Sequence, residues 1–249
     1  IVGITAIQNI TNSALNAGVQ LLKSLTVDPI LTGLDEYETK MNAIKTILAN
    51  TSAKGTTLED VNKVLQDLNE YADKTIYNFA QMTDMVGKFS ASTGELYSSA
   101  SIVKGLANLA ATAGVGNERL QGALYQVSQV GKGDYFMKID WNSLENAGLA
   151  TQKFKQDLIA MGKEMGAFKG MEDTLTGLTN GTINFGKTLE KGWLTQEVFS
   201  AVTAMYALDE EMTKTAGEIT TFTKLFEVMR ESVGSGWAKT WENIIGDKE

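Results

Sequence analysis

The sequence predicts an all-α protein, and three observations support that prediction. Only one proline occurs in 249 residues, against a usual frequency of about 5%, so almost nothing interrupts a helical pattern. Apolar side chains return every three or four positions along most of the chain, as they do on one face of a helix. With 43% hydrophobic and 21% charged residues, the composition is that of a globular protein. We therefore expect a compact multi-helix domain with an extended uncharged N-terminal helix and an irregular, glycine-rich segment around residues 162–192.

The first predicted helix covers residues 1–22, which contain no charged side chain. Its apolar face is formed by Ile4, Ile7, Leu15, Val19 and Leu22. Thr, Asn and Gln fill the opposite face, so the segment is too polar for an ordinary membrane span of about 20 apolar residues. We expect the five apolar residues to form a buried or self-associating face, and insertion of this face into a membrane is the alternative.

Three more helices are predicted before residue 90. After the turn at Pro29, an apolar stripe predicts a helix whose core positions are Leu34, Tyr37, Met41, Ile44 and Leu48. Thr57 followed by Asp60 has the spacing of a capping box with an acidic residue as its second member, so we expect the next helix to begin there. A further helix is predicted from Ile76 through Phe89, because apolar residues recur along it at helical spacing.

The second half of the chain predicts helices separated by one complex loop. Residues 98–113 are rich in Ala, Gly and Ser, which lets backbones approach closely, so we expect a central helix there. The stretch "GKGDYFMKIDWNSLENAG" combines glycines with aromatic residues and predicts a loop with a short helix. Helical spacing returns at residues 151–164, in "TQEVFSAVTAMYAL" and in "EITTFTKLFEVMRESV". The last of these carries a core stripe of Ile219, Phe222, Leu225, Phe226 and Met229.

The predicted domain organisation has two parts. Residues 1–28 form the uncharged helix and a linker, and residues 29–249 form a globular helical domain. Because the chain begins with "IVGITAIQNI" and no initiator Met, we expect it to continue from an upstream segment.

The composition excludes several classes of chemistry. The chain has no Cys and no His, so it lacks the usual base of a nucleophilic triad and the commonest zinc ligands. No dense run of oxygen ligands is apparent for calcium, and we expect neither a metal nor another cofactor. A formal net charge of -8 disfavours binding to nucleic-acid phosphates, which takes clustered Lys and Arg.

One motif nevertheless points to an enzyme. "GTINFGKT", residues 181–188, has the spacing of the phosphate-binding loop of nucleotide hydrolases, in which Lys187 and Thr188 would contact phosphate and metal. That loop needs a buried strand before it and a helix that begins at the Lys. The preceding "GMEDTLTGLTN" is polar and broken by glycines, so we expect a chance match and no catalytic residue. A nucleotide hydrolase remains the alternative function.

Two other sets of residues have a functional and a structural interpretation. Asp140 and Glu145 could form an acid and base pair for sugar-chain cleavage, but nothing in the sequence sets their separation. With 30 acidic residues such pairs are inevitable, and we expect structural or solvated roles. The four tryptophans lie beside polar neighbours, where Trp usually covers the core of its own domain and otherwise anchors a partner. They are Trp141, Trp193, Trp237 and Trp241.

Several segments, in order, resemble the tape measure protein family of tailed bacteriophages and prophages. "GSGWAKTWENIIGD" resembles the closing signature of that family, and "LDEYETKMNAIKTILANTSAKGTTLEDVNKVLQDLNEYADKTIYNF" resembles its opening block. "GLANLAATAG" and "ALYQVSQV" are similar to its middle, "MKIDWNSLENAG" to its aromatic loop, and "KGWLTQEVF" to the segment before the end. These segments are distributed along the chain from Leu34 to Asp247.

The resemblance implies a structural role without catalysis. Members of the family are long helical chains inside the tail tube, whose length sets the length of the tail and which leave ahead of the DNA during genome delivery. The implied location is the lumen of the phage tail in the virion, after assembly in the bacterial cytoplasm. The implied partners are other copies of the chain, as a trimer, the tail tube protein, and tail-tip, distal tail or baseplate hub proteins. The host membrane is a further possible partner during ejection, and no specific nucleic acid is implied.

Overall fold

The computed structural model of the protein describes residues 34–73, 75, 77–130 and 135–207. These residues form ten α-helices and two short 3-10 helices, and they contain no β-strand. The predicted all-α class is confirmed for this part of the chain. The described residues fall into two compact units, which meet in sequence between Leu96 and Tyr97. The predicted domain at residues 29–249 spans both units.

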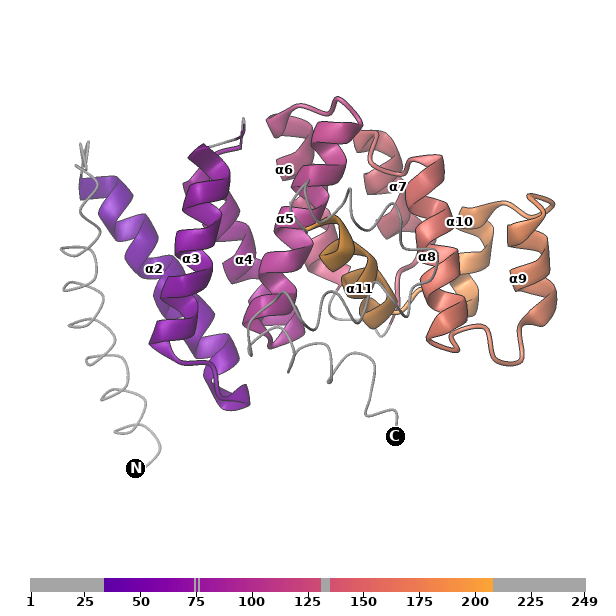
Figure 1. Ribbon diagram of the computed structural model, residues 1–249, viewed down its shortest axis with the longest axis horizontal. Helices are drawn as coiled ribbons and strands as arrows, with labels where there is room; N and C mark the ends of the chain where they lie inside the picture. The colour runs from indigo at the N-terminus through magenta and orange to yellow at the C-terminus, as the bar shows by residue number, and fades with distance from the viewer. Residues whose placement is uncertain (1–33, 74, 76, 131–134, 208–249) are drawn as a thin grey trace. The chain divides into compact units, whose positions relative to one another are not determined.

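The first unit contains α2 (Leu34–Thr51), η1 (Ser52–Lys54), α3 (Leu58–Asp73) and α4 (Phe79–Thr93). Helix α2 packs against both α3 and α4 (Figure 1). Each helix buries one apolar stripe, and the fully enclosed side chains include Ile47, Val61, Leu68, Val86 and Phe89. The helices predicted from spacing at these positions are therefore present, and their apolar faces form the core of this unit.

The ends of α3 and α4 follow local capping chemistry. Asp60 accepts a hydrogen bond from the backbone N–H of Thr57 at 2.8 Å, and Thr57 Oγ1 accepts one from the N–H of Asp60 at 3.2 Å. The predicted capping box is thus confirmed. The following helix, predicted on the stripe that runs from Ile76 to Phe89, begins at Phe79, where Asn78 caps α4 by accepting from the N–H of Gln81. Ile76 lies outside the described residues.

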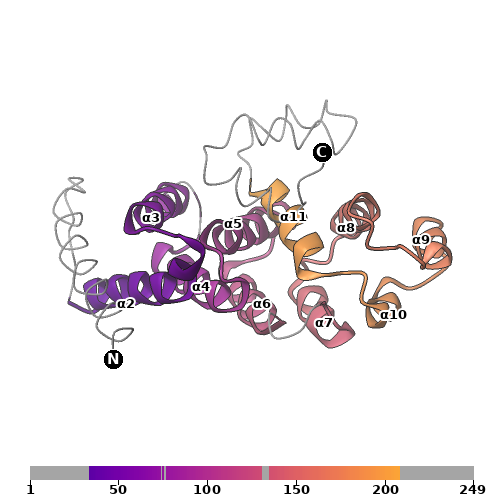
Figure 2. The ribbon, with the colours of Figure 1, turned by 90° about the horizontal axis from the view of Figure 1, so that it is seen from below.

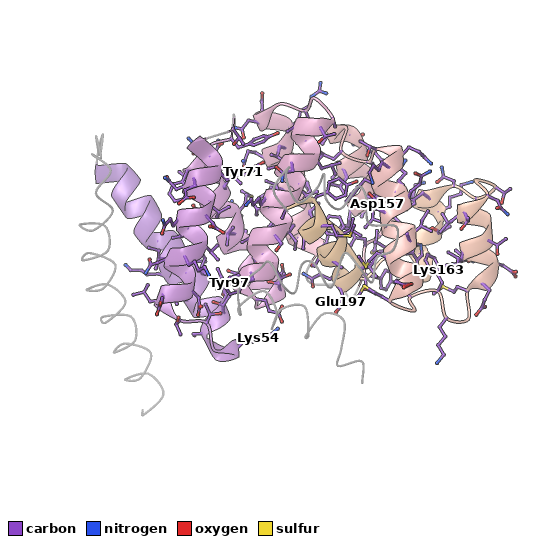
Figure 3. All side chains as sticks on the ribbon, viewed as in Figure 1. Lys54, Tyr71, Tyr97, Asp157, Lys163 and Glu197 are labelled. Carbon is purple, nitrogen blue, oxygen red and sulfur yellow. The ribbon has the colours of Figure 1, made fainter. Side chains whose placement is uncertain are left out.

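A lysine joins the two ends of this unit that lie far apart in sequence. Lys54, labelled in Figure 3, donates to Glu95 Oε1 at 2.8 Å and to the backbone carbonyl of Thr93 at 3.3 Å. Gly94 ends α4 with a positive φ of 66°, a conformation that favours glycine. The contact fixes the turn after η1 against the end of α4.

The second unit contains the remaining helices. These are α5 (Leu96–Thr112), α6 (Asn117–Val130), α7 (Lys138–Ala147), α8 (Gln152–Glu164), α9 (Glu172–Thr179), α10 (Phe185–Thr188), η2 (Leu189–Lys191) and α11 (Gln196–Tyr206). Helix α6 packs on α7, α8 packs on α9, and α10 packs on α7. Helix α11 lies between α5 and α8, as Figures 1 and 2 both show. The first and the last described helices of this unit are therefore neighbours.

Helix α5 is buried on nearly all sides, as its small residues predict. Leu106, Ala107 and Ala110 are fully buried, and so are several serines. A Cβ atom added at Gly105 would overlap the backbone carbonyl of Thr203 on α11. The two helix backbones thus touch where one residue lacks a side chain, and the predicted central helix is confirmed.

The loop with a short helix that the sequence predicts also forms. Tyr135 and Thr195 make an isolated antiparallel bridge, and the N–H of Phe136 donates to the carbonyl of Leu194 at 2.8 Å. This pairing ties the chain entering α7 to the chain entering α11. The short helix is α7, which starts three residues after Tyr135.

The glycine-rich segment around residues 162–192 is irregular, as predicted. It contains helices of only 8, 4 and 3 residues. Gly181 and Gly192 follow two of them with φ of 68° and 77°, values that favour glycine. A glycine thus closes α9 and η2, whereas α10 continues directly into η2.

Two predicted helices, residues 1–22 and the stripe from Ile219 to Met229, lie outside the described residues. Within the described part of the chain, no helix is both long enough and apolar enough to cross a membrane.

Candidate functional site

Two of the four predicted tryptophans lie in one cluster of aromatic rings in the second unit. Trp141 is on α7, and Trp193 lies between η2 and α11; neither side chain has any exposed surface. We call their surroundings the aromatic cluster, which consists of Phe136, Trp141, Phe154, Phe168, Phe185, Trp193, Phe199 and Tyr206. These residues come from segments separated by up to 70 positions, so the cluster joins most of the unit.

The rings of the aromatic cluster form one unbroken series of contacts. Trp193 stacks on Phe168 with centroids 4.6 Å apart and meets the edge of Phe185 at 5.4 Å. Phe185 lies 4.4 Å from Trp141. Trp141 in turn lies 6.2 Å from Phe154. These separations are those of favourable ring pairs.

The series continues from Phe154 into α11. Phe154 meets Phe199 edge-on at 6.0 Å and Tyr206 at 5.7 Å. Phe199 stacks on Phe136 at 4.3 Å. Since each such pair stabilises by about 0.5–1.5 kcal/mol beyond burial of its area, the cluster is a major source of stability for this unit.

Both indole N–H groups have hydrogen-bond partners. Trp141 Nε1 donates to Glu145 Oε1 at 3.0 Å, and the same oxygen accepts from Lys155 Nζ at 3.3 Å. Trp193 Nε1 donates to Thr188 Oγ1 at 3.0 Å. A buried N–H without a partner would cost about 1–3 kcal/mol, so these bonds allow both indoles to be completely enclosed.

The phosphate-loop motif has a different structure from the one its chemistry requires. Helix α9 precedes it in place of a strand, and α10, which contains Lys187, has only four residues. Thr188, which would bind the metal, is 1% exposed. Its hydroxyl donates to the carbonyl of Phe185 and accepts from Trp193. In this structure the motif is therefore part of the packing around the aromatic cluster.

The two acidic residues of the second motif are both engaged in local structure. Asp140 accepts from the backbone N–H of Met137 at 2.8 Å and so caps the start of α7. Glu145 holds the indole of Trp141 and the ammonium group of Lys155. Both lie on the same helix, and the structure does not bring them together across a cleft.

One polar group was not anticipated from the sequence. Tyr206, in the last turn of α11, donates its hydroxyl to Asp157 Oδ2 on α8 at 2.6 Å, and Asp157 also binds Lys153. Figure 3 labels Asp157 on α8. Burial, together with the hydrogen bond and the negative charge of Asp157, raises the pKa of Tyr206 well above its ordinary value. No sequence signal relates residues that are 49 positions apart.

The remaining predicted site residues lie outside the described part of the chain. They are Trp237 and Trp241 and the N-terminal face of Ile4, Ile7, Leu15, Val19 and Leu22. Among the described residues, no group of three or more acidic side chains is placed to hold a metal ion.

Comparisons with models of protein families, with curated proteins and with solved structures find no match to this chain.

Proposed function

We propose that this chain is a structural domain of a phage tape measure protein, which acts in tail assembly and genome delivery and has no catalytic role. The proposal starts from the ordered resemblance of its segments to that family. The all-α architecture of the described residues agrees with a chain of this kind.

The observation that supports the proposal most is where the resembling segments lie. "MKIDWNSLENAG" supplies Trp141, and "KGWLTQEVF" supplies Trp193 and Phe199. Both segments contribute rings to the aromatic cluster, and the N–H of Phe136, the residue before the first segment, donates to the carbonyl of Leu194 in the second. Three of the eight residues of the aromatic cluster thus lie in segments that carry the resemblance, which supports a shared fold rather than a shared reaction.

A mechanical role accounts for the charge and the length of the chain. An acidic protein, with formal net charge -8, is repelled by DNA that later passes through the same lumen. At about 1.5 Å per helical residue, a tail many rings long requires a much longer chain. We therefore assign this domain to one part of a longer ruler, with the tail tube protein and the tail-tip or hub proteins as its partners.

The proposal can be tested in a bacteriophage or prophage that encodes the chain. Trp141→Asp places a charge in the aromatic cluster, and we expect it to abolish normal tails in electron micrographs and to reduce infectivity by orders of magnitude. Gln126→Asp, on the exposed face of α6, is the matched control and leaves tails normal. Full-length tails and wild-type infectivity with Trp141→Asp would disprove the proposal.

The proposed trimer has a separate test in solution. Light scattering of the 249-residue chain, with and without residues 1–22, measures whether that segment drives self-association. We expect a trimer that becomes a monomer on truncation, and a charge at Ile7 or Leu15 to have the same effect. A monomer in every case would remove residues 1–22 as the self-association face.

A further inference from the structure

The turn between α9 and α10 (Figure 1) contains an asparagine followed directly by a glycine. Asn180 is the first residue after α9, and Gly181 follows it. Both residues are exposed. No other asparagine in the 249-residue sequence is followed by glycine. Here alone, therefore, a side-chain carboxamide stands next to a backbone N–H whose residue has no side chain to shield it.

The carboxamide of Asn180 has no hydrogen-bond partner among the residues that the structure describes. Other asparagines of this unit are held in place. Asn184 is also exposed, but its Oδ1 accepts from the N–H of Lys187 at 3.3 Å and so caps α10. Asn108 donates to the carbonyl of Tyr206 at 2.6 Å. The side chain of Asn180 is therefore free to change its rotamer.

The backbone nitrogen of Gly181 is accessible from the side on which another residue would carry its side chain. No atom lies within 4 Å of a Cβ added at Gly181, and its φ of 68° favours glycine. A side chain at this position would hinder the approach of the nitrogen to the neighbouring carboxamide. Gly181 leaves that approach open.

The turn must open before this nitrogen can reach the carboxamide carbon. Asn180 has a ψ of -2°, and this angle must rotate to bring the two atoms together. The N–H of Gly181 donates to the carbonyl of Leu178 at 3.2 Å, which is at the long end of hydrogen-bond distances. Helix α9 has only 8 residues, and helix ends open locally at little cost in free energy. Opening of this last turn therefore controls any reaction between the two groups.

We propose that Asn180 is a site of spontaneous deamidation, which proceeds through a cyclic imide formed with Gly181. The Gly181 nitrogen gives its proton to hydroxide and attacks Cγ of Asn180. A new N–C bond forms, the C–N bond of the carboxamide breaks, and ammonia leaves. Water then adds to either carbonyl of the ring and reopens it as aspartate or isoaspartate. In total one water is consumed and one ammonia released, and the chain gains one negative charge.

The new charge falls at the C-terminus of α9. The carbonyl groups at this end of a helix carry partial negative charge, so a carboxylate there is unfavourable. Isoaspartate also lengthens the backbone at the residue whose N–H donates to the carbonyl of Thr176 at 3.0 Å. Both products therefore weaken the last turn of α9. The reaction is independent of the proposed function, because it requires only this turn and water.

Peptide mapping by mass spectrometry of the full 249-residue protein measures the reaction. Trypsin releases residues 170–187 as one peptide, which contains Asn180 and Asn184, so the second asparagine is an internal control. After incubation at pH 7.4 and 37 °C, we expect a gain of about 1 Da at Asn180 and none at Asn184. An isoaspartyl methyltransferase, which methylates isoaspartate and not aspartate, identifies the cyclic imide, because direct hydrolysis of the carboxamide yields aspartate alone.

The same chain unfolded in guanidinium chloride gives the reference rate. We expect the folded protein to react about tenfold more slowly, which corresponds to about 1.4 kcal/mol for opening the turn. Asn180→Gln should abolish the mass gain, because its longer side chain must close a larger ring. Asn180→Asp carries the charge of one product and should accelerate amide exchange in α9 about twofold to fivefold.

A folded rate within about a hundredfold of the unfolded rate, with isoaspartate among the products, supports the proposal. A slower folded rate, or aspartate as the sole product, would overturn it. Equal mass gains at Asn180 and Asn184 would do the same, since the glycine would then have no part in the reaction. Unchanged exchange in α9 of Asn180→Asp would overturn the expected weakening of that helix.

Discussion

At the residue scale, Gly105 determines how closely α5 and α11 approach. A methyl group there would overlap the carbonyl of Thr203, and a backbone atom in a packed core has little room to move. We expect Gly105→Ala to lower the free energy of unfolding by about 3 kcal/mol, at the upper end of overpacking effects. Urea denaturation followed by circular dichroism measures this change.

The control for Gly105→Ala is the same substitution at Gly122 on α6. No atom lies within 4 Å of a Cβ added there. Because Ala favours a helix interior by about 0.5–1 kcal/mol over Gly, Gly122→Ala should stabilise the protein slightly. A Gly105→Ala variant as stable as wild type would show that α5 and α11 do not touch at this point.

The hydrogen bond between Tyr206 and Asp157 makes stability depend on alkaline pH. The pKa of Tyr206 is raised in the folded protein, so the unfolded chain loses the phenolic proton first as pH rises above about 10. The folded state then binds more protons than the unfolded state, and the free energy of unfolding falls with pH. The stabilising contribution is fully present below pH 10 and is lost above it.

We therefore expect two effects of Tyr206→Phe. At pH 8 the variant should lose about 1–2 kcal/mol, because a hydrogen bond to a charged acceptor is removed. Between pH 9 and 11 its stability should decline less steeply than that of wild type. Urea titrations across this range measure both effects, with the exposed Tyr135→Phe as control. Parallel pH profiles for Tyr206→Phe and wild type would contradict the assignment.

At the element scale, Asp140 shows how a residue that resembles a catalytic acid instead starts a helix. Its carboxylate accepts from the N–H of Met137, and loss of such a cap costs about 1 kcal/mol. We expect Asp140→Ala to lower the free energy of unfolding by that amount, and Asn142→Ala, on the exposed side of the same helix, to change it by less than about 0.5 kcal/mol. Thermal denaturation at pH 7 compares the two. Equal effects would mean that the cap contributes nothing.

The elements that the sequence predicts correctly are those whose signals are local. The capping box depends only on Thr57 and Asp60, which are three positions apart. The burial of α5 follows from the many small residues of that helix itself. The apolar spacing through Ile76 did not indicate where α4 begins. The Asn78 side chain fixes that start by accepting from the N–H of Gln81, the third residue of the helix.

The candidate site depended on contacts that no local pattern encodes. Trp141 and Trp193 could be singled out from sequence, but their joining through Phe185 is a tertiary contact. Residues 181–188 match the spacing of a phosphate-binding loop, but a helix and not a buried strand precedes them. Tyr206 and Asp157 had no signal at all, since only the packing of α11 on α8 brings them together.

At the scale of the whole molecule, the division at Leu96 and Tyr97 predicts how instability spreads. Each unit has its own buried phenylalanines, such as Phe89 on α4 and Phe154 on α8, with 1% and 0% exposure. Truncation of either to Ala costs about 3–5 kcal/mol.

Because units with separate cores open separately, we expect Phe89→Ala to accelerate amide exchange in α2 to α4 and Phe154→Ala to accelerate it in α7 to α11. Hydrogen exchange read by mass spectrometry compares the two variants. If both variants instead exchanged faster throughout the described helices, the two units would unfold together. A substitution in the aromatic cluster would then destabilise the first unit as well.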